Sequence, residues 1–192
     1  MGRSAPRPKD AVQTRELILA AARREFASSG FAGATVRAIA AQADVSTNLI
    51  TRYFGGKEGL FVAATEVHLA LDRILDGPRE TLGRRLADSI VTRWTTMRGE
   101  DPLLVLLRVA GERHEAAKTL AEFLDEESLE PFRRQLLRYG LSEREASERA
   151  RAVDIFVVGI STRLRVLSDD LGDPEVLREW LAANLQRLVD AP

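Results

Sequence analysis

The stretch from Thr35 to Lys57 constrains the fold more than any other part of this 192-residue chain. Its pattern predicts two short helices joined by a tight turn. Thr35 and Ser46 stand where these helices begin, and a hydroxyl can accept a hydrogen bond from the free backbone N–H groups at a helix start. Asp44 stands at the corner, and aspartate tolerates the left-handed conformation that such a corner needs. We therefore expect a helical hairpin with a sharp corner.

The polar residues of the second helix indicate a use for this hairpin. The apolar residues expected where the two helices touch are Val36, Ile39, Ala40, Val45 and Ile50. The outward face of the second helix is then left with hydrogen-bonding groups. This is the arrangement of a helix-turn-helix, whose second helix enters the DNA major groove. The alternative is an ordinary hairpin with a solvated face, which is less favoured because Arg37 and Lys57 adjoin the same surface.

Three segments resemble one known family. They are TRELILAAARREFASSGF from Thr14, TVRAIAAQADVS from Thr35 and YFGGKEGLF from Tyr53. Together they resemble the DNA-binding domain of the TetR family of transcriptional regulators. The sequence departs from that pattern at Asp44, where the family usually has glycine, and at Leu49, where many members have a small polar residue. No DNA contact is therefore assigned to Leu49.

Composition limits the other classes. The chain has no cysteine, which excludes disulfides and thiolate metal sites and makes the cytoplasm the expected compartment. No apolar run approaches the ~20 residues of a membrane span, and the first residues lack the apolar core of a signal peptide. Residues 1–59 have nine basic and five acidic side chains, whereas residues 60–192 have nineteen and twenty-four. A basic N-terminal part followed by an acidic remainder suits a protein that contacts phosphates with one end.

Helical periodicity and helix-breaking residues predict an all-α fold of about nine helices. Residues 1–9 are expected to form a disordered basic arm, residues 10–56 the helix-turn-helix domain, and residues 57–192 a larger helical domain for effector binding and dimerisation. The first helix is expected at 10–28, and a single rod over 57–75 is expected to join the two domains. Further helices are expected at 79–98, 101–113, 115–139, 142–168 and 174–189. Ser142 and Glu145 have the spacing of a capping box.

The last two expected helices have apolar faces, which the resemblance implies pair with a second copy of the chain in a four-helix bundle. The alternative for these residues is the internal core of one copy. A dimer is also favoured by DNA geometry, because one recognition helix reads few base pairs and two read a palindromic operator. The residues expected at this interface are Phe156, Ile160, Leu164, Leu177, Trp180, Leu181 and Leu188.

In the family, the middle helices bind small effectors, and apolar residues there suggest a cavity. Plain core packing is the more favoured interpretation of any single residue among them. Arg108 lies inside an apolar run, where it could anchor an anionic ligand, pair with an acid or extend its guanidinium to water. The residues expected to line a pocket are Trp94, Met97, Leu106, Arg108 and Phe123. No cofactor or metal is expected, because His68 and His114, the two histidines, lack a metal-binding spacing.

The function that these features favour is a ligand-responsive transcriptional repressor. Arg37 is the best candidate for reading a base, since a guanidinium can make two bonds to guanine, and Asn48 suits adenine. The residues expected to contact bases or backbone are Thr35, Arg37, Ser46, Thr47, Asn48, Thr51, Arg52, Tyr53 and Lys57. The alternatives are a regulator without a small-molecule effector, a helical protein-interaction adaptor, and a helical enzyme. The enzyme is least favoured, because no nucleophile with a base, metal cluster or paired-carboxylate spacing is present.

Overall fold

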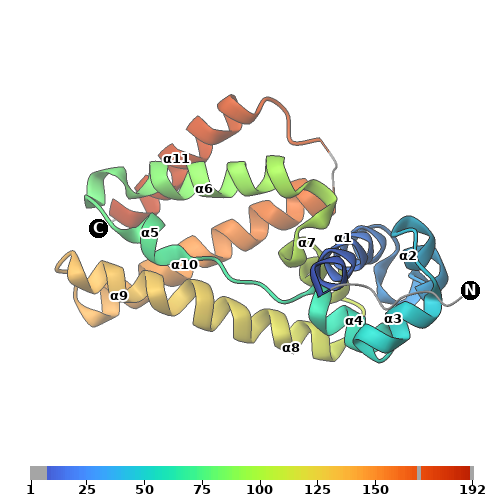
Figure 1. The fold of residues 1–192 in the computed structure, drawn as a ribbon. Coiled ribbons are helices and arrows are strands. Elements are labelled where there is room, and N and C mark those ends of the chain that lie inside the picture. Colours follow the sequence, from blue (N-terminus) through green and yellow to red (C-terminus); the bar gives the residue numbers. More distant parts are fainter. Residues whose placement is uncertain (1–7, 168–169, 191–192) are drawn as a thin grey trace, which may run out of the picture. The chain divides into compact units, whose positions relative to one another are not determined.

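The computed structural model describes residues 8–167 and 170–190, and within them it contains helices and no strand, which confirms the predicted all-α class (Figure 1). The chain divides into two compact units. The first contains the described residues up to Glu66 together with Gly99–His114, and the second contains Val67–Arg98 together with the described residues from Glu115 onward. The helices are α1 (Pro8–Gly33), α2 (Val36–Gln42), α3 (Thr47–Phe54), α4 (Lys57–Ala64), α5 (Leu71–Leu75), α6 (Leu82–Met97), α7 (Pro102–Val109), α8 (His114–Phe123), α9 (Glu130–Arg138), α10 (Glu143–Ser161) and α11 (Pro174–Asp190).

In the first unit, α1 packs against α2, α4 and α7. Its apolar stripe is buried as the sequence predicts, with Ile18 and Phe26 at 0% exposure. Phe26 stacks on Phe31, and the Phe61 ring of α4 meets both at about right angles, with ring centroids 5.2 Å apart in each pair. These aromatic contacts fix α4 against the end of α1.

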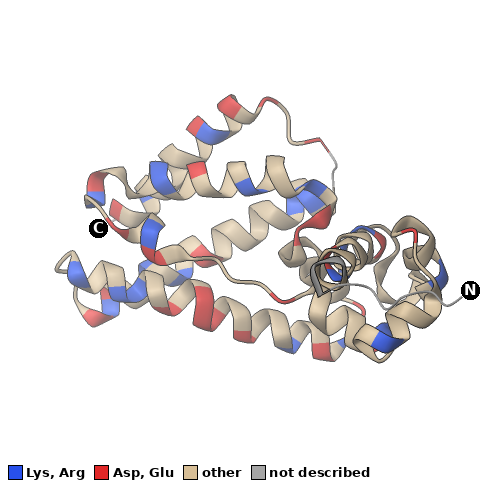
Figure 2. Cartoon of the chain, in the orientation of Figure 1, with Lys and Arg blue, Asp and Glu red and all other residues tan. Residues whose placement is uncertain are grey.

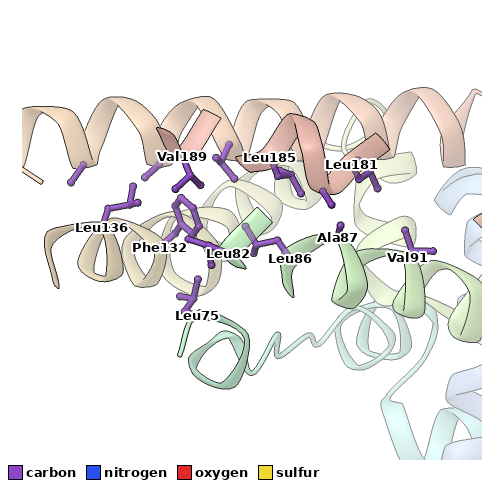
Figure 3. Close-up of a cluster of buried hydrophobic side chains, with 14 of the residues drawn as sticks. Leu75, Leu82, Leu86, Ala87, Val91, Phe132, Leu136, Leu181, Leu185 and Val189 are labelled. Carbon is purple, nitrogen blue, oxygen red and sulfur yellow. The ribbon is translucent and has the colours of Figure 1, made fainter. Parts of the chain in front are cut away.

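The second unit is built around the long contact between α6 and α11 (Figure 3). Leucines from α6 and α11 meet in a cluster that also takes in Phe132 of α9 and Leu75 of α5. At one end of the contact, Gly83 lets the two backbones approach closely, since a Cβ at this position would lie 2.5 Å from the nitrogen of Gln186. The Gly83 N–H also donates to the Gln186 side chain at 2.8 Å.

The predicted rod over residues 57–75 is wrong, because the helix ends at Ala64 and resumes as α5 only at Leu71. Side chains donate hydrogen bonds to carbonyl groups in the last turn of α4. The Arg23 guanidinium donates to the Ala64 carbonyl at 3.0 Å, and the Thr65 hydroxyl donates to the Phe61 carbonyl at 2.9 Å. The sequence pattern does not reveal the first contact, since it joins residues 41 positions apart.

The bounds of the first helix also differ from those predicted. It begins at Pro8 and extends to Gly33, with a break at Gly30. The early start is compatible with proline, because the first turn of a helix needs no N–H donor there. The predicted arm therefore ends before Pro8, and its residues 1–7 lie outside the described residues.

Two predicted helices are present but include wider turns. Residues 114–138 form one continuous helix, in which a π-helical segment over Leu124–Leu129 lies just before Pro131. A proline inside a helix removes one N–H donor and crowds the preceding turn, which a wider turn relieves. A second π-helical segment, Thr162–Val166, ends the helix that starts with α10. The capping box at Ser142 and Glu145 is confirmed, while α7 ends at Val109, earlier than predicted.

Burial raises the pKa of Asp154 on α10, and the nearby Asp125 carboxylate adds to this effect, whereas a hydrogen bond with Ser128 opposes it. The folded protein therefore binds a proton more tightly here than the unfolded chain does, so the free energy of unfolding falls as pH rises past the ordinary aspartate pKa of about 3.9. We expect Asp154→Asn to raise the Tm at pH 7 on the order of 2 °C.

Thermal unfolding at several pH values checks this expectation. Near pH 3, roughly one unit below the ordinary aspartate pKa, the gain should vanish. Asp125→Asn should give a smaller gain at pH 7, since Asp125 acts only through its charge. An Asp154→Asn protein that is less stable than the parent at pH 7 would contradict the assignment.

Candidate nucleic-acid interface

The hairpin corner is built as the sequence predicts. The Thr35 hydroxyl accepts a hydrogen bond from the Ala38 N–H at 3.1 Å and so caps the start of α2. Asp44 adopts the left-handed conformation, with φ of 53°. The Val45 N–H then donates to the Ala40 carbonyl at 2.9 Å, which closes the turn. The direction of α3 relative to α2 is therefore fixed by backbone hydrogen bonds.

Helix α3 has one fully buried side chain. Of its eight residues, all of which the structure describes, Ile50 alone is fully buried, at 0% exposure. Ser46 precedes the helix with an extended backbone, as an N-cap residue should, but its hydroxyl makes no capping bond. The predicted capping role of that hydroxyl is thus wrong, and the Ser46 side chain is exposed.

The polar residues predicted to meet DNA lie on the surface of the first unit. Those that are exposed are Thr35, Arg37, Ser46, Thr47, Asn48, Thr51 and Arg52, while Tyr53 and Lys57 are half-buried. Neither α2 nor α3 carries an acidic residue, so Arg37 and Arg52 face no carboxylate on their own helices (Figure 2). Such a surface offers donors and acceptors together with positive charge, which is what base edges and phosphates require.

Lys57 has contacts within the protein that the sequence does not indicate. Its ammonium lies 4.6 Å from the centroid of the Phe31 ring and 3.5 Å from the Ala32 carbonyl oxygen. An ammonium group has three donors, so this position still leaves donors for a phosphate. The DNA role of Lys57 stays a prediction.

Comparison with protein families assigns both parts of the chain. Residues 18–64 match the profile described as bacterial regulatory proteins of the tetR family. Residues 80–189, more than half of the chain, match the tetracyclin repressor-like C-terminal domain. The chain belongs to the TetR family. This confirms the resemblance seen in the sequence and makes the chain a transcriptional regulator with a helix-turn-helix.

Solved structures of TetR-like regulators have the same fold. A TetR-like regulator from Rhodococcus sp. RHA1 is 19% identical, with a TM-score of 0.72 over 98% of this chain and 100% of that one. The fatty acid degradation regulator FadR from Bacillus halodurans is 18% identical, with a TM-score of 0.68 over 92% and 98%. NalD from Pseudomonas aeruginosa, the secondary repressor of the MexAB-OprM multidrug efflux pump, is 22% identical, with a TM-score of 0.61 over 93% and 97%. A search of curated proteins found no match.

The residues predicted to line an effector pocket are divided between the two units. Leu106 and Arg108 lie on α7 in the first unit, whereas Trp94, Met97 and Phe123 belong to the second. Trp94 is only 3% exposed and is part of the α6–α11 cluster, which fits core packing. Met97, in contrast, is 42% exposed. Neither unit of this TetR-family protein gathers all five residues.

A cavity of about 480 Å³ opens instead between α5 and α9 in the second unit. Two carboxylates of the α5 segment, Asp72 and Asp76, line it, and Arg134 and Arg138 of α9 line it as well. Gln135, which is 8% exposed, lies between these two arginines in the sequence. The cavity is polar, and none of the five residues predicted for the pocket lines it.

The residues predicted for a dimer interface mostly pack against the core of the second unit and keep only part of their surface exposed. Those that are half-buried are Phe156, Ile160, Leu164, Leu177 and Leu188, while Trp180 is 47% exposed and its ring centroid lies 5.8 Å from that of Phe156. Leu181 is a correction, since it is fully buried against the rest of its unit and has no surface to offer a partner. Ile155 and Val176, at 64% and 65% exposure, are apolar neighbours that the prediction omitted.

Among residues 8–167 and 170–190, no helix is long and apolar enough to cross a membrane. Within the same residues, no group of histidine, aspartate and glutamate side chains is arranged to hold a metal ion.

Proposed function

We propose that this TetR-family protein is a sequence-specific repressor that binds a palindromic operator as a homodimer and is released by a small-molecule effector. The observation that carries the DNA-binding part is the exposed polar face of α3 beside Arg37, held by the buried Ile50. Thr47, Asn48 and Thr51 would meet base edges there. The remaining predicted contacts, from Thr35, Ser46, Arg52, Tyr53 and Lys57, would set the register on the phosphates.

Selection from a library of random duplexes tests this part of the proposal. The purified protein should enrich one pseudo-palindromic sequence, with half-sites separated by about one helical turn or a multiple of it. Enrichment without any shared sequence, or no retained DNA, would contradict it and would favour a protein-interaction adaptor. We call this enriched duplex the operator.

Dimerisation is proposed through α10 and α11, because apolar side chains remain exposed on both helices. NalD is described as a repressor, which supports repression, and not activation, as the regulatory effect of this chain. For a DNA reader the pairing has a physical use, since two copies of α3 contact two half-sites and so increase discrimination.

Trp180→Ser tests the proposed interface. Large aromatic side chains dominate interface energies, so the loss of this ring should weaken dimerisation by about 30-fold or more. Analytical ultracentrifugation over a concentration series measures the change. Val12→Ser, which removes an exposed apolar side chain of α1, is the matched control and should leave the association unchanged. A Trp180→Ser protein that associates as tightly as the parent would exclude this face.

The effector is proposed to bind the second unit. The cavity between α5 and α9 favours a small polar molecule, because its walls carry both guanidinium and carboxylate groups. To change operator occupancy, such a ligand needs only a difference in affinity between two states of the protein, typically ~1–3 kcal/mol. A regulator without an effector would instead show operator affinity that no small molecule alters.

A further inference from the structure

The end of α1 contains a break that leaves backbone donors without helical partners. At Gly30 the backbone has φ of 66° and ψ of −179°, so the residues after it begin a new short turn. The first N–H groups of any helical turn have no carbonyl of the preceding turn to donate to. In most helices a serine, threonine, aspartate or asparagine supplies the acceptor, but the residue here is glycine.

A distant carboxylate supplies the missing acceptor. Glu112, which follows α7, accepts a hydrogen bond from the Phe31 N–H at 3.1 Å and one from the Ala32 N–H at 3.5 Å. The side chain fits because Gly30 has no Cβ, since a Cβ there would lie 2.2 Å from a carboxylate oxygen of Glu112. All these residues belong to the first unit. Glu112 thus acts as an N-cap contributed from 81 residues away.

The side chain of the next residue, Arg113, contacts the same turn. The Arg113 guanidinium lies 3.9 Å from the centroid of the Phe31 ring. That ring also contacts Phe61 of α4 and lies 4.6 Å from the ammonium of Lys57, the first residue of α4. Only Gly55 and Gly56 separate α4 from α3. Contacts therefore run from Glu112 and Arg113 through Phe31 to the helix that follows α3.

We propose that Glu112 is a positioning residue of the DNA reader, although it lies far outside the helix-turn-helix in sequence. Because α3 has a single buried anchor, its tilt depends on the elements at its two ends, and Glu112 fixes the turn on which α4 rests. The inference rests on the proposed DNA-binding function. It also makes the turn after α7 a part of the DNA-binding unit, in agreement with the assignment of Gly99–His114 to the first unit.

The test uses the full chain, the operator and a scrambled duplex of equal length, with affinities measured by fluorescence anisotropy over a salt series. Glu112→Ala should lower the ratio of operator affinity to scrambled-duplex affinity by about three- to tenfold. Its affinity for the scrambled duplex and its salt dependence should change little, because no phosphate contact is removed. Glu112→Gln keeps an oxygen acceptor and removes the charge, so it should restore most of the ratio.

Two further variants complete the test. Glu122→Ala on α8 removes an exposed carboxylate that pairs with Lys118, and it should leave the ratio unchanged. Gly30→Ala should displace the Glu112 side chain, so adding Glu112→Ala to it should reduce the ratio no further.

The possible failures are distinguishable. If the parent protein does not discriminate between the two duplexes, the proposed function itself fails. If the parent discriminates and Glu112→Ala retains the full ratio, the positioning role is overturned. A Glu112→Ala protein that loses affinity for both duplexes in parallel with its Tm would show a purely structural contact, and that result also overturns the inference.

Discussion

Gly83→Ala should lower the free energy of unfolding by about 2–3 kcal/mol and the Tm by roughly 5–10 °C. The new Cβ would lie 2.5 Å from the Gln186 nitrogen and 2.6 Å from the Ala182 carbonyl oxygen, and both are backbone atoms that no rotamer change can move away. The α6–α11 contact would have to open at this end. Alanine gains up to ~1 kcal/mol over glycine in a helix, which is too little to offset that loss.

Differential scanning calorimetry at one fixed protein concentration measures the effect, since association would otherwise shift the Tm. Gly111→Ala is the matched control, because nothing lies within 4 Å of a Cβ at that position. It should change the free energy of unfolding by no more than about 0.5 kcal/mol. Equal stability of the Gly83→Ala and parent proteins would mean that the two helices do not pack as closely as described.

Arg37→Ala should weaken operator binding by about 10- to 100-fold for each half-site, the range expected when one bidentate contact to a guanine is lost. Arg37 is exposed on α2, and neither α2 nor α3 carries an acidic residue that could hold its guanidinium. The affinity for scrambled DNA should fall much less, because that binding comes from phosphate contacts spread over several residues. Fluorescence anisotropy at constant salt gives both affinities.

Arg84→Ala, which removes an exposed arginine of α6, serves as the control for the loss of one positive charge. It should leave the operator preference intact. Substitutions in the operator add a second check. The operator affinity of the Arg37→Ala protein should no longer depend on the base pair that Arg37 contacts, in either half-site. Unaltered discrimination by the Arg37→Ala protein would remove this residue from the set of base readers.

The parts of the fold that the sequence predicts well depend on neighbouring residues. The cap at Thr35, the left-handed corner at Asp44 and the capping box at Ser142 each need groups no more than three residues apart. Helix periodicity likewise predicts the buried stripe of α1, because burial follows from which face is apolar. Local patterns of this kind also carried the family resemblance, which the family comparison confirms.

The features that the sequence does not predict depend on contacts between distant residues. The helix after Lys57 ends at Ala64, whose carbonyl accepts a hydrogen bond from Arg23, whereas apolar spacing alone predicts its continuation to Leu75. Glu112 accepts hydrogen bonds from two backbone N–H groups that lie 81 and 80 positions away, and no spacing along the sequence indicates this contact. Leu177, Trp180 and Leu181 all belong to the apolar face that helical spacing predicts for α11. Only the packing of α6 against α11 shows that Leu181 faces inward.

The most direct measurement compares the parent protein with the triple variant Thr47→Ala, Asn48→Ala and Thr51→Ala for binding to the operator and to a scrambled duplex. All three side chains are exposed, so their removal should leave the fold and the Tm unchanged. The triple variant should lose most of the parent's preference for the operator and keep only the part that Arg37 provides, while its affinity for both duplexes stays salt-sensitive. A triple variant that still prefers the operator as strongly as the parent does would show that α3 does not read the sequence of DNA.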